Sequence, residues 1–257
     1  MTADDKLRSP MPDLQRMGAQ SGNKKQEESN VFEWSERRIE WYERALAFTG
    51  YAAVLADALE KLLPEGESVC DLGCGTGYLA RELARRGYDV CGADRSGLAL
   101  SVLRSEKERL GLERLTVLEG DWNDYEASWD NVVMVSAGHF DKELTKYLSL
   151  CRKRLILVVK EDKSSYVLPK GETSPLRLRD YPVAEALEGL DHSVEGFSAE
   201  FGQPLRDADE AREYITYFGG DPDAPGSAMG RLRESHRADF PYYLPNRSEK
   251  LIYRVDK

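Results

Sequence analysis

The chain has 257 residues, of which 41% are hydrophobic, and a formal net charge of −10 at pH 7. A chain of this length can bury a substantial core within one α/β domain. The acidic balance argues against a nucleic-acid partner, which would call for a basic footprint. No run approaches the roughly 20 apolar residues of a membrane helix, and residues 1–30 lack the apolar stretch of a signal peptide. Composition therefore predicts a cytoplasmic protein with no membrane partner.

The cysteines give no sign of a metal site or a disulfide framework. They form neither a Cys-x-x-Cys pair nor a His/Cys metal spacing, and free cysteines in core strands behave as small hydrophobic residues. We expect four reduced thiols and no metal at Cys70, Cys74, Cys91 and Cys151.

The N-terminal part of the chain changes character near residue 31. Residues 1–30 are polar and predict a disordered tail, and residues 31–257 predict a single domain. From Trp34 to Leu63 the apolar spacing is helical, and Gly50 divides it into two helices. Residues 31–63 are therefore expected to form helices that cover the rest of the domain. One helix face would carry Trp34, Trp41, Ala45 and Phe48.

Residues 66–160 alternate short apolar runs with helical patterns. Helices are expected at Tyr78–Arg86, Gly97–Leu110 and Leu144–Cys151. This alternation is typical of parallel βαβ units with right-handed crossovers. The predicted strands are Ser68–Leu72, Asp89–Ala93, Leu115–Glu119, Asn131–Val135 and Arg154–Lys160.

Residues 161–257 have a weaker pattern and are expected to hold the last strands together with insertions. Glu161–Asp180 is polar and predicts a loop, and residues 219–246 are rich in Gly, Pro and Arg. The predicted elements are a short helix at Tyr181–Leu190, a strand at His192–Phe201, a helix at Ala208–Phe218 and a strand at Lys250–Val255.

The most specific motif follows the first predicted strand. Asp71 lies near the end of that strand, glycines follow at every second position, and a helix then begins. The spacing differs from Gly-x-Gly-x-x-Gly, the dinucleotide fingerprint. The motif predicts a turn that binds a nucleotide-type cofactor, and the alternative is a tight strand–helix turn of another α/β fold. The pattern Asp-x-Gly-x-Gly-x-Gly comprises Asp71, Gly73, Gly75 and Gly77.

This motif resembles the first motif of the class I S-adenosylmethionine (SAM) dependent methyltransferases. The resemblance implies an α/β, Rossmann-like fold with a seven-stranded, mostly parallel sheet flanked by helices. It also implies an antiparallel hairpin of the last two strands at one sheet edge. Residues 66–160 would bind SAM. Glycines allow the backbone to approach the cofactor closely, and the amides of the next helix favour its carboxylate.

Two further motifs follow the second and third strands. Asp94 ends the second strand, where a carboxylate can accept hydrogen bonds from ribose hydroxyls; the alternative is an N-cap for the helix near Ser96. After the third strand, the resemblance places Asp121 beside the adenine amino group and Trp122 on the adenine ring. The alternative for Trp122 is core packing.

The fourth strand ends at Ser136, near the expected position of the sulfonium. His139 follows and could act as a general base for a hydroxyl or ammonium acceptor. The alternative is a loop residue that positions the turn before the next helix. The resemblance implies that an aromatic residue of the cover helices, Tyr42, contacts the cofactor. The alternative is that Tyr42 only packs its helix against the domain. The full set of cofactor-binding candidates is Tyr42, Asp71, Gly73, Cys74, Gly75, Thr76, Gly77, Asp94, Arg95, Gly120, Asp121, Trp122 and Ser136.

The sequence therefore predicts a methyltransferase that moves a methyl group from SAM to a small-molecule N, O or S acceptor, with S-adenosylhomocysteine as product. Val135–Gly138 holds no Asn-Pro-Pro-Tyr-like tetrad, which argues against DNA-amino and protein-glutamine methylation. A protein or RNA methyltransferase and a non-catalytic SAM-binding regulatory protein remain alternatives. Aromatic faces for the acceptor could come from Tyr214, Tyr217, Tyr242 and Tyr243.

Overall fold

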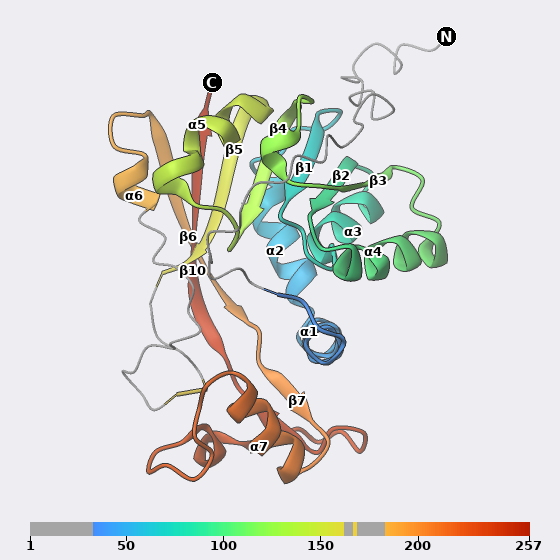
Figure 1. Ribbon diagram of the computed structural model, residues 1–257, viewed down its shortest axis with the longest axis vertical. Coiled ribbons are helices and arrows are strands. Elements are labelled where there is room, and N and C mark those ends of the chain that lie inside the picture. The colour runs from blue at the N-terminus through green and yellow to red at the C-terminus, as the bar shows by residue number, and fades with distance from the viewer. Residues whose placement is uncertain (1–32, 162–166, 169–182) are drawn as a thin grey trace, which may run out of the picture.

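The computed structural model describes residues 33–161, 167–168 and 183–257 (Figure 1). The predicted disordered tail, residues 1–30, and most of the predicted loop Glu161–Asp180 lie outside the described residues. None of the helices in the described ranges combines the length and apolar character needed to cross a bilayer.

Two helices precede the sheet, as the sequence predicts. Helix α1 (Glu36–Thr49) begins after Ser35, whose hydroxyl accepts a hydrogen bond from the backbone N–H of Arg38. It ends at Gly50, which has a left-handed φ of 67° and donates its N–H to the carbonyl of Leu46. Helix α2 (Tyr51–Glu60) starts directly afterwards. Because Gly50 redirects the chain, α1 and α2 pack against different parts of the molecule.

The central sheet confirms the predicted Rossmann-like class. It has seven strands in the order β3-β2-β1-β4-β5-β10-β6, and its first five strands are parallel. Strand β10 runs antiparallel to both of its neighbours. The strands are β1 (Ser68–Leu72), β2 (Asp89–Asp94), β3 (Leu115–Glu119), β4 (Trp129–Val135), β5 (Cys151–Lys160), β6 (His192–Glu200) and β10 (Arg247–Asp256).

Helices cover both faces of this sheet. Helices α2, α3 (Tyr78–Arg85) and α4 (Gly97–Leu110) share one buried cluster with one side of β1 and β2. Helices α5 (Phe140–Leu150) and α6 (Val183–Ala186) belong to the cluster on the opposite face. Helix α5 begins at Phe140 rather than at the predicted Leu144, because the buried ring of Phe140 anchors its first turn. Strands β3 and β4 are joined through the short 3-10 helix η3 (Trp122–Asp124).

The edge of the sheet differs from the hairpin that the resemblance implied. Strands β6 and β10 do pair in antiparallel fashion, but residues 201–246 separate them and fold into a unit that we call the insertion lobe. The predicted helix is present as α7 (Ala208–Tyr217), whereas the small sheet β7-β9-β8 was not predicted. Its other elements are β7 (Gln203–Leu205), η4 (Ala228–Arg231), β8 (Arg233–Glu234) and β9 (Tyr242–Leu244). Figure 1 shows α1 between this lobe and the large sheet.

Candidate functional site

The glycine loop, residues 73–77, turns the chain from β1 into α3 at the carboxyl edge of the sheet. Its three glycines have left-handed φ values of 75°, 57° and 72°. The N–H groups of Gly73 and Cys74 both donate to the carbonyl of Ala93, at 2.8 and 3.0 Å. A Cβ at Gly77 would lie 2.4 Å from a methyl carbon of Leu103, so only glycine fits where α3 meets α4. The loop is therefore fixed from β2 and α4.

Asp71 supports this loop from inside the protein. Its side chain is buried, and Oδ2 accepts a hydrogen bond of 3.2 Å from the N–H of Ala80 in the first turn of α3. Burial raises the pKa of Asp71 to about 7, and the negative charge of Asp94 adds a smaller contribution in the same direction. Among the described residues no cation pairs with Asp71. It positions the loop and α3 from behind.

Asp94 lies at the end of β2 and contacts the glycine loop directly. Its Oδ2 accepts a 2.8 Å hydrogen bond from the N–H of Gly75, and its Oδ1 accepts one of the same length from the N–H of Ser96. The N-cap of α4 is Ser96, whose hydroxyl accepts from Ala99, so Asp94 is not that cap. Each carboxylate oxygen of Asp94 retains a further lone pair. The side chain can thus accept hydrogen bonds from a ligand placed over the loop.

Three other candidates near the loop differ in what they can offer a ligand. Arg95 is exposed and forms no hydrogen bond or ion pair with any described residue. The thiol of Cys74 is buried beside Gly92, and burial raises its pKa, so only the backbone of Cys74 can face a ligand. Thr76 is fully buried, and its hydroxyl has no hydrogen-bond partner within the described ranges.

The segment after β3 lies beside the loop. The N–H of Gly120 donates to the carbonyl of Asp94 at 3.1 Å. Asp121 is exposed and caps η3, since its Oδ1 accepts from the N–H of Asn123 at 2.8 Å. Trp122 packs edge-on against Tyr147, with ring centroids 5.7 Å apart.

Trp122 therefore points inward, toward the core. Its Cζ3 atom lies 3.8 Å from the position that a Cβ of Gly73 would occupy. Its indole Nε1 is buried and has no hydrogen-bond partner in the described part of the chain. This placement favours the packing alternative for the ring, and it leaves one polar atom unsatisfied close to the glycine loop.

The segment after β4 holds the predicted catalytic candidate. Ser136 is exposed and adopts a φ of 51°, which is unusual for a residue with a side chain. His139 is the N-cap residue of α5, but its side chain does not accept a hydrogen bond from that helix. Its backbone N–H instead donates to the hydroxyl of the buried Tyr147 at 2.9 Å, and Tyr147 donates to Glu143. These bonds fix the backbone that carries the imidazole.

The cover helix α1 brings aromatic rings onto the glycine loop. A Cβ at Gly75 would lie 2.5 Å from Cζ2 of Trp34, so the indole rests on this glycine. Trp34 packs edge-on against Tyr42, at 5.2 Å between centroids, and Tyr42 packs against Tyr78 at 5.8 Å. Burial raises the pKa of Tyr42 above its ordinary value and that of Tyr51 to about 12. Both phenols are therefore neutral hydrogen-bond donors at neutral pH.

Sequence reasoning missed Trp34 as a site residue. It was assigned to the apolar face of the first helix with Trp41, whereas it precedes the N-cap Ser35 and lies outside the helix. The sequence signal was the aromatic residue next to a capping serine. Only the fold reveals its contact with Gly75.

Three of the four aromatic residues proposed for the acceptor pack between the insertion lobe and α1, and the fourth, Tyr242, is exposed. Tyr214 packs against Trp41 at 5.0 Å between ring centroids. The hydroxyl groups of Tyr217 and Ser35 lie 2.9 Å apart, and Tyr243 stacks on Phe48 at 5.0 Å. These rings join the lobe to α1 instead of gathering around one pocket.

The candidate site thus lies at the carboxyl edge of the parallel strands. The strand order reverses between β1 and β4, and in open α/β sheets ligands bind at such a switch point. The glycine loop, Asp94 and the strained segment after β4 meet there. This geometry defines a protein of the Rossmann-like class with a site for a nucleotide-type ligand.

Part of the chain is similar to known methyltransferases. Residues 69–156 match the family model described as the methyltransferase domain. The chain is 34% identical over 104 residues to the cypemycin N-terminal methyltransferase of a Streptomyces species, which covers 39% of this chain and 41% of that protein. It is 52% identical over 40 residues to the ubiquinone biosynthesis O-methyltransferase of Alkalilimnicola ehrlichii, 16% of each chain. The matches thus span less than half of these relatives.

A solved structure is similar to this protein over most of the chain. A Bacillus halodurans protein described as a methyltransferase shares 17% identity and a TM-score of 0.50, covering 79% of this chain and 98% of the other. The Rossmann-like fold that the resemblance implies is therefore confirmed for strands β1 to β5 and their helices, and residues 69–156 within this part match the methyltransferase domain.

Proposed function

We propose that this protein is a SAM-dependent methyltransferase that transfers a methyl group to a small-molecule N, O or S acceptor. The observation that carries the proposal is the bond between Asp94 and the N–H of Gly75. It joins the acidic end of β2 to the glycine loop and leaves carboxylate lone pairs beside that loop. The family match at residues 69–156 supports this use of the site.

The residues at the loop fit SAM as a ligand. Asp94 suits the two ribose hydroxyls, and the exposed Asp121 suits the adenine amino group. The hydroxyl of Thr76 and the Nε1 of Trp122 are buried polar atoms without partners in the described ranges. Such atoms are rare in proteins and favour a bound polar group nearby. The first turn of α3 offers backbone N–H groups to a carboxylate.

The chemistry needs orientation more than it needs catalytic groups. When bound, SAM supplies a methyl carbon on a cationic sulfur; the acceptor lone pair bonds to this carbon while the carbon–sulfur bond breaks and leaves its electrons on sulfur. Asp94 would hold the ribose, and the fixed backbone at Ser136 and His139 would hold the acceptor in line. His139 would take the proton from a hydroxyl, thiol or ammonium acceptor.

The small-molecule acceptor rests on weaker support than the donor. The net charge of −10 disfavours an RNA acceptor. One relative is by name an O-methyltransferase of ubiquinone biosynthesis, and another is an N-terminal methyltransferase. Oxygen and nitrogen acceptors are therefore both compatible with this core.

Calorimetry with SAM and S-adenosylhomocysteine tests the donor. Wild-type protein should bind both ligands, and Asp94→Ala should bind each about 30-fold more weakly, because charge-assisted hydrogen bonds are worth about 2 kcal/mol. Asp191→Ala, an exposed acid before β6, serves as the matched control and should bind normally. A folded wild-type protein that binds neither ligand would refute the proposal.

Transfer of tritiated methyl groups from SAM in cell extract tests the acceptor. Label that passes a size cutoff supports a small molecule, whereas label retained with protein or RNA would replace it with a macromolecular acceptor. Binding of SAM without transfer in any extract would favour a non-catalytic SAM-binding protein.

A further inference from the structure

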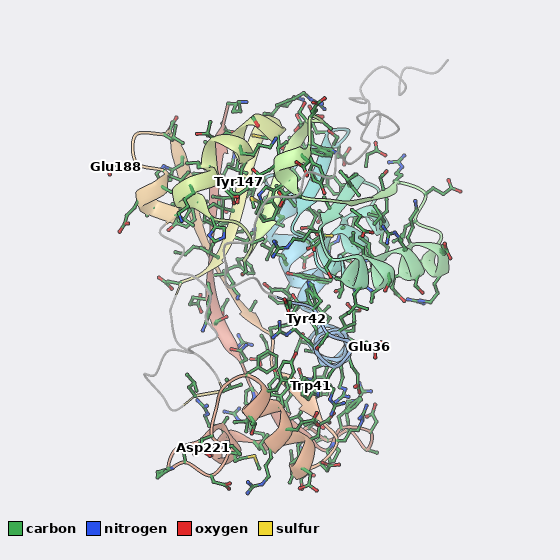
Figure 2. The ribbon with its side chains drawn as sticks, in the orientation of Figure 1. Glu36, Trp41, Tyr42, Tyr147, Glu188 and Asp221 are labelled. Atoms are coloured by element: carbon green, nitrogen blue, oxygen red, sulfur yellow. The ribbon has the colours of Figure 1, made fainter. Side chains whose placement is uncertain are left out.

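Helix α1 has two opposite faces that contact different parts of the molecule. Trp41 is buried in the core of the insertion lobe, with Tyr214 at 5.0 Å and Tyr217 at 5.2 Å between ring centroids. The next residue, Tyr42, contacts Tyr78 at the start of α3. Figure 2 shows Trp41 on the lobe side of α1 and Tyr42 on the side of the sheet. The helix therefore connects the lobe to the glycine loop.

A buried carboxylate in the lobe fixes α1 from its lobe side. The side chain of Glu210, in α7, is 4% exposed, and that of Arg44, in α1, is 7% exposed. The Nη1 of Arg44 donates to both carboxylate oxygens of Glu210, at 2.8 and 2.9 Å. The indole N–H of Trp41 donates to Glu210 at 3.3 Å, and the backbone N–H of Arg206 donates at 2.7 Å. The bonds from Arg44 and Trp41 hold α1 against the lobe, and the bond from Arg206 fixes Glu210 within the lobe.

The connection from α1 to α2 does not impose this orientation. Gly50 joins the two helices with a left-handed φ, and no atom lies within 4 Å of the position that its Cβ would take. Arg44 is further held by Glu40, at 2.5 Å, and by the ring of Phe240, 4.7 Å from its guanidinium carbon. The position of α1 thus depends on its partners on both sides: Glu43 pairs with Arg81 of α3 at 2.9 Å, and Arg44 pairs with Glu210 of the lobe.

We propose that Glu210 is a positioning residue for the cofactor site. By holding Arg44 and Trp41, it fixes α1 so that Tyr42 packs on Tyr78 and Trp34 lies on Gly75 of the glycine loop. This inference rests on the proposed binding of SAM at that loop. Glu210 lies in the lobe and acts through α1, so the insertion lobe controls how tightly the donor binds.

Binding of S-adenosylhomocysteine to Glu210→Gln tests this role. The glutamine amide has one acceptor oxygen and brings an NH₂ group toward Arg44, so the bonds to α1 cannot all persist. We expect at least fivefold weaker binding by calorimetry. Asp209→Asn is the matched control, because Asp209 is an exposed acid on the same helix and forms no bond to α1 in the described part of the chain. Equal affinities of Glu210→Gln and wild type would overturn the proposal.

A double-mutant cycle separates positioning from a general loss of stability. Tyr42→Ala removes the side chain through which Glu210 is proposed to act. If the proposal holds, Glu210→Gln weakens binding less than twofold further in the Tyr42→Ala background. Additive effects would show that Glu210 does not act through Tyr42.

Hydrogen exchange of the ligand-free protein decides the inference even if the proposed function fails. Backbone amides of residues 73–80 should exchange at least fivefold faster in Glu210→Gln than in Asp209→Asn. Arg44→Gln, which removes the partner, should give the same increase if Glu210→Gln does not fold. Exchange at residues 73–80 that matches the control in a folded variant would overturn the inference, whatever the wild type binds.

Discussion

The carboxyl edge of the large sheet and the insertion lobe are stabilised in different ways. At the sheet edge, short loops follow strands that are fully buried, such as β1, and the backbone itself makes most of the contacts. In the lobe, strands of two or three residues are held by aromatic rings and by a buried ion pair. In the described ranges, the sheet edge holds Thr76 Oγ1 and Trp122 Nε1 without hydrogen-bond partners, whereas both carboxylate oxygens of Glu210 in the lobe accept hydrogen bonds.

The difference separates the proposed binding site from the part that we propose positions it. Asp71 and Glu210 illustrate the contrast, since both carboxyl groups are buried. Glu210 has Arg44 as a partner, whereas among the described residues Asp71 has only the N–H of Ala80. The charge of Glu210 orients α1 relative to the lobe through the ion pair with Arg44. The buried Asp71 lies beside the proposed cofactor site and lowers the stability of the folded protein.

Trp41→Ala should produce the largest effect, and it should destabilise the insertion lobe more than the large sheet. Trp41 is 1% exposed and fills the space between α1 and α7. Truncating a buried tryptophan costs about 3–5 kcal/mol of unfolding free energy. Denaturant unfolding should show this loss, and hydrogen exchange should rise in residues 203–246 far more than in β1.

Phe48→Ala is the control for this change, because Phe48 is only half-buried against Tyr243. It should cost much less than Trp41→Ala. An equal rise of exchange in β1 and in the lobe would show that the two regions unfold as one unit.

The two regions also differ in how far the sequence predicts them. The strands around Asp71 and Asp94 alternate with helices, so this part of the fold could be predicted from local residue types. The structure places both residues at the glycine loop, and their role in holding the donor stays a prediction. Trp34, Glu210 and Arg44 could not be assigned, because their roles depend on partners far along the chain. Glu210 lies 166 residues from Arg44, and a charge pattern on α7 does not show which helix it meets. The strands β8 and β9 are too short to give an alternating pattern.

His139→Ala should lower turnover and leave donor binding unchanged. A general base contributes about 100-fold or more to proton transfer, and the backbone of His139 is held independently of its imidazole through Tyr147. The rate of methyl transfer and the affinity for S-adenosylhomocysteine should be measured together. His192→Ala, at the exposed start of β6, is the control. Turnover at the wild-type rate in His139→Ala would reduce this residue to a loop position.

Asp71→Asn should change how stability depends on pH. The folded protein holds the Asp71 proton up to a pKa of about 7, well above the ordinary pKa of about 3.9 for an aspartate side chain. The folded state therefore binds more protons between these values, and this group makes stability fall as pH rises through the range. From pH 5 to pH 8 the contribution is on the order of 2 kcal/mol.

Asparagine can still accept from Ala80 and carries no charge, so Asp71→Asn should lose this dependence and be the more stable protein at pH 8. Urea unfolding of both proteins at pH 5 and pH 8 provides the measurement, with Asp57→Asn, an exposed acid on α2, as control. Parallel pH profiles for wild type and Asp71→Asn would mean that Asp71 is already ionised at pH 5.

Gly75→Ala, compared with Gly111→Ala, should produce the smallest effect. The comparison tests whether the residues before α1 contribute to binding at the glycine loop. Both glycines are left-handed, so each alanine should cost about 1 kcal/mol of stability from backbone strain alone. A Cβ at Gly111 meets no atom within 4 Å, whereas one at Gly75 would lie 2.5 Å from the ring of Trp34. Gly75→Ala must therefore displace the indole from the loop, and we expect about tenfold weaker binding of S-adenosylhomocysteine, or about 1.4 kcal/mol. Gly111→Ala should bind as wild type does. Equal affinities for the two variants would show that the contact between Trp34 and the glycine loop takes no part in holding the donor.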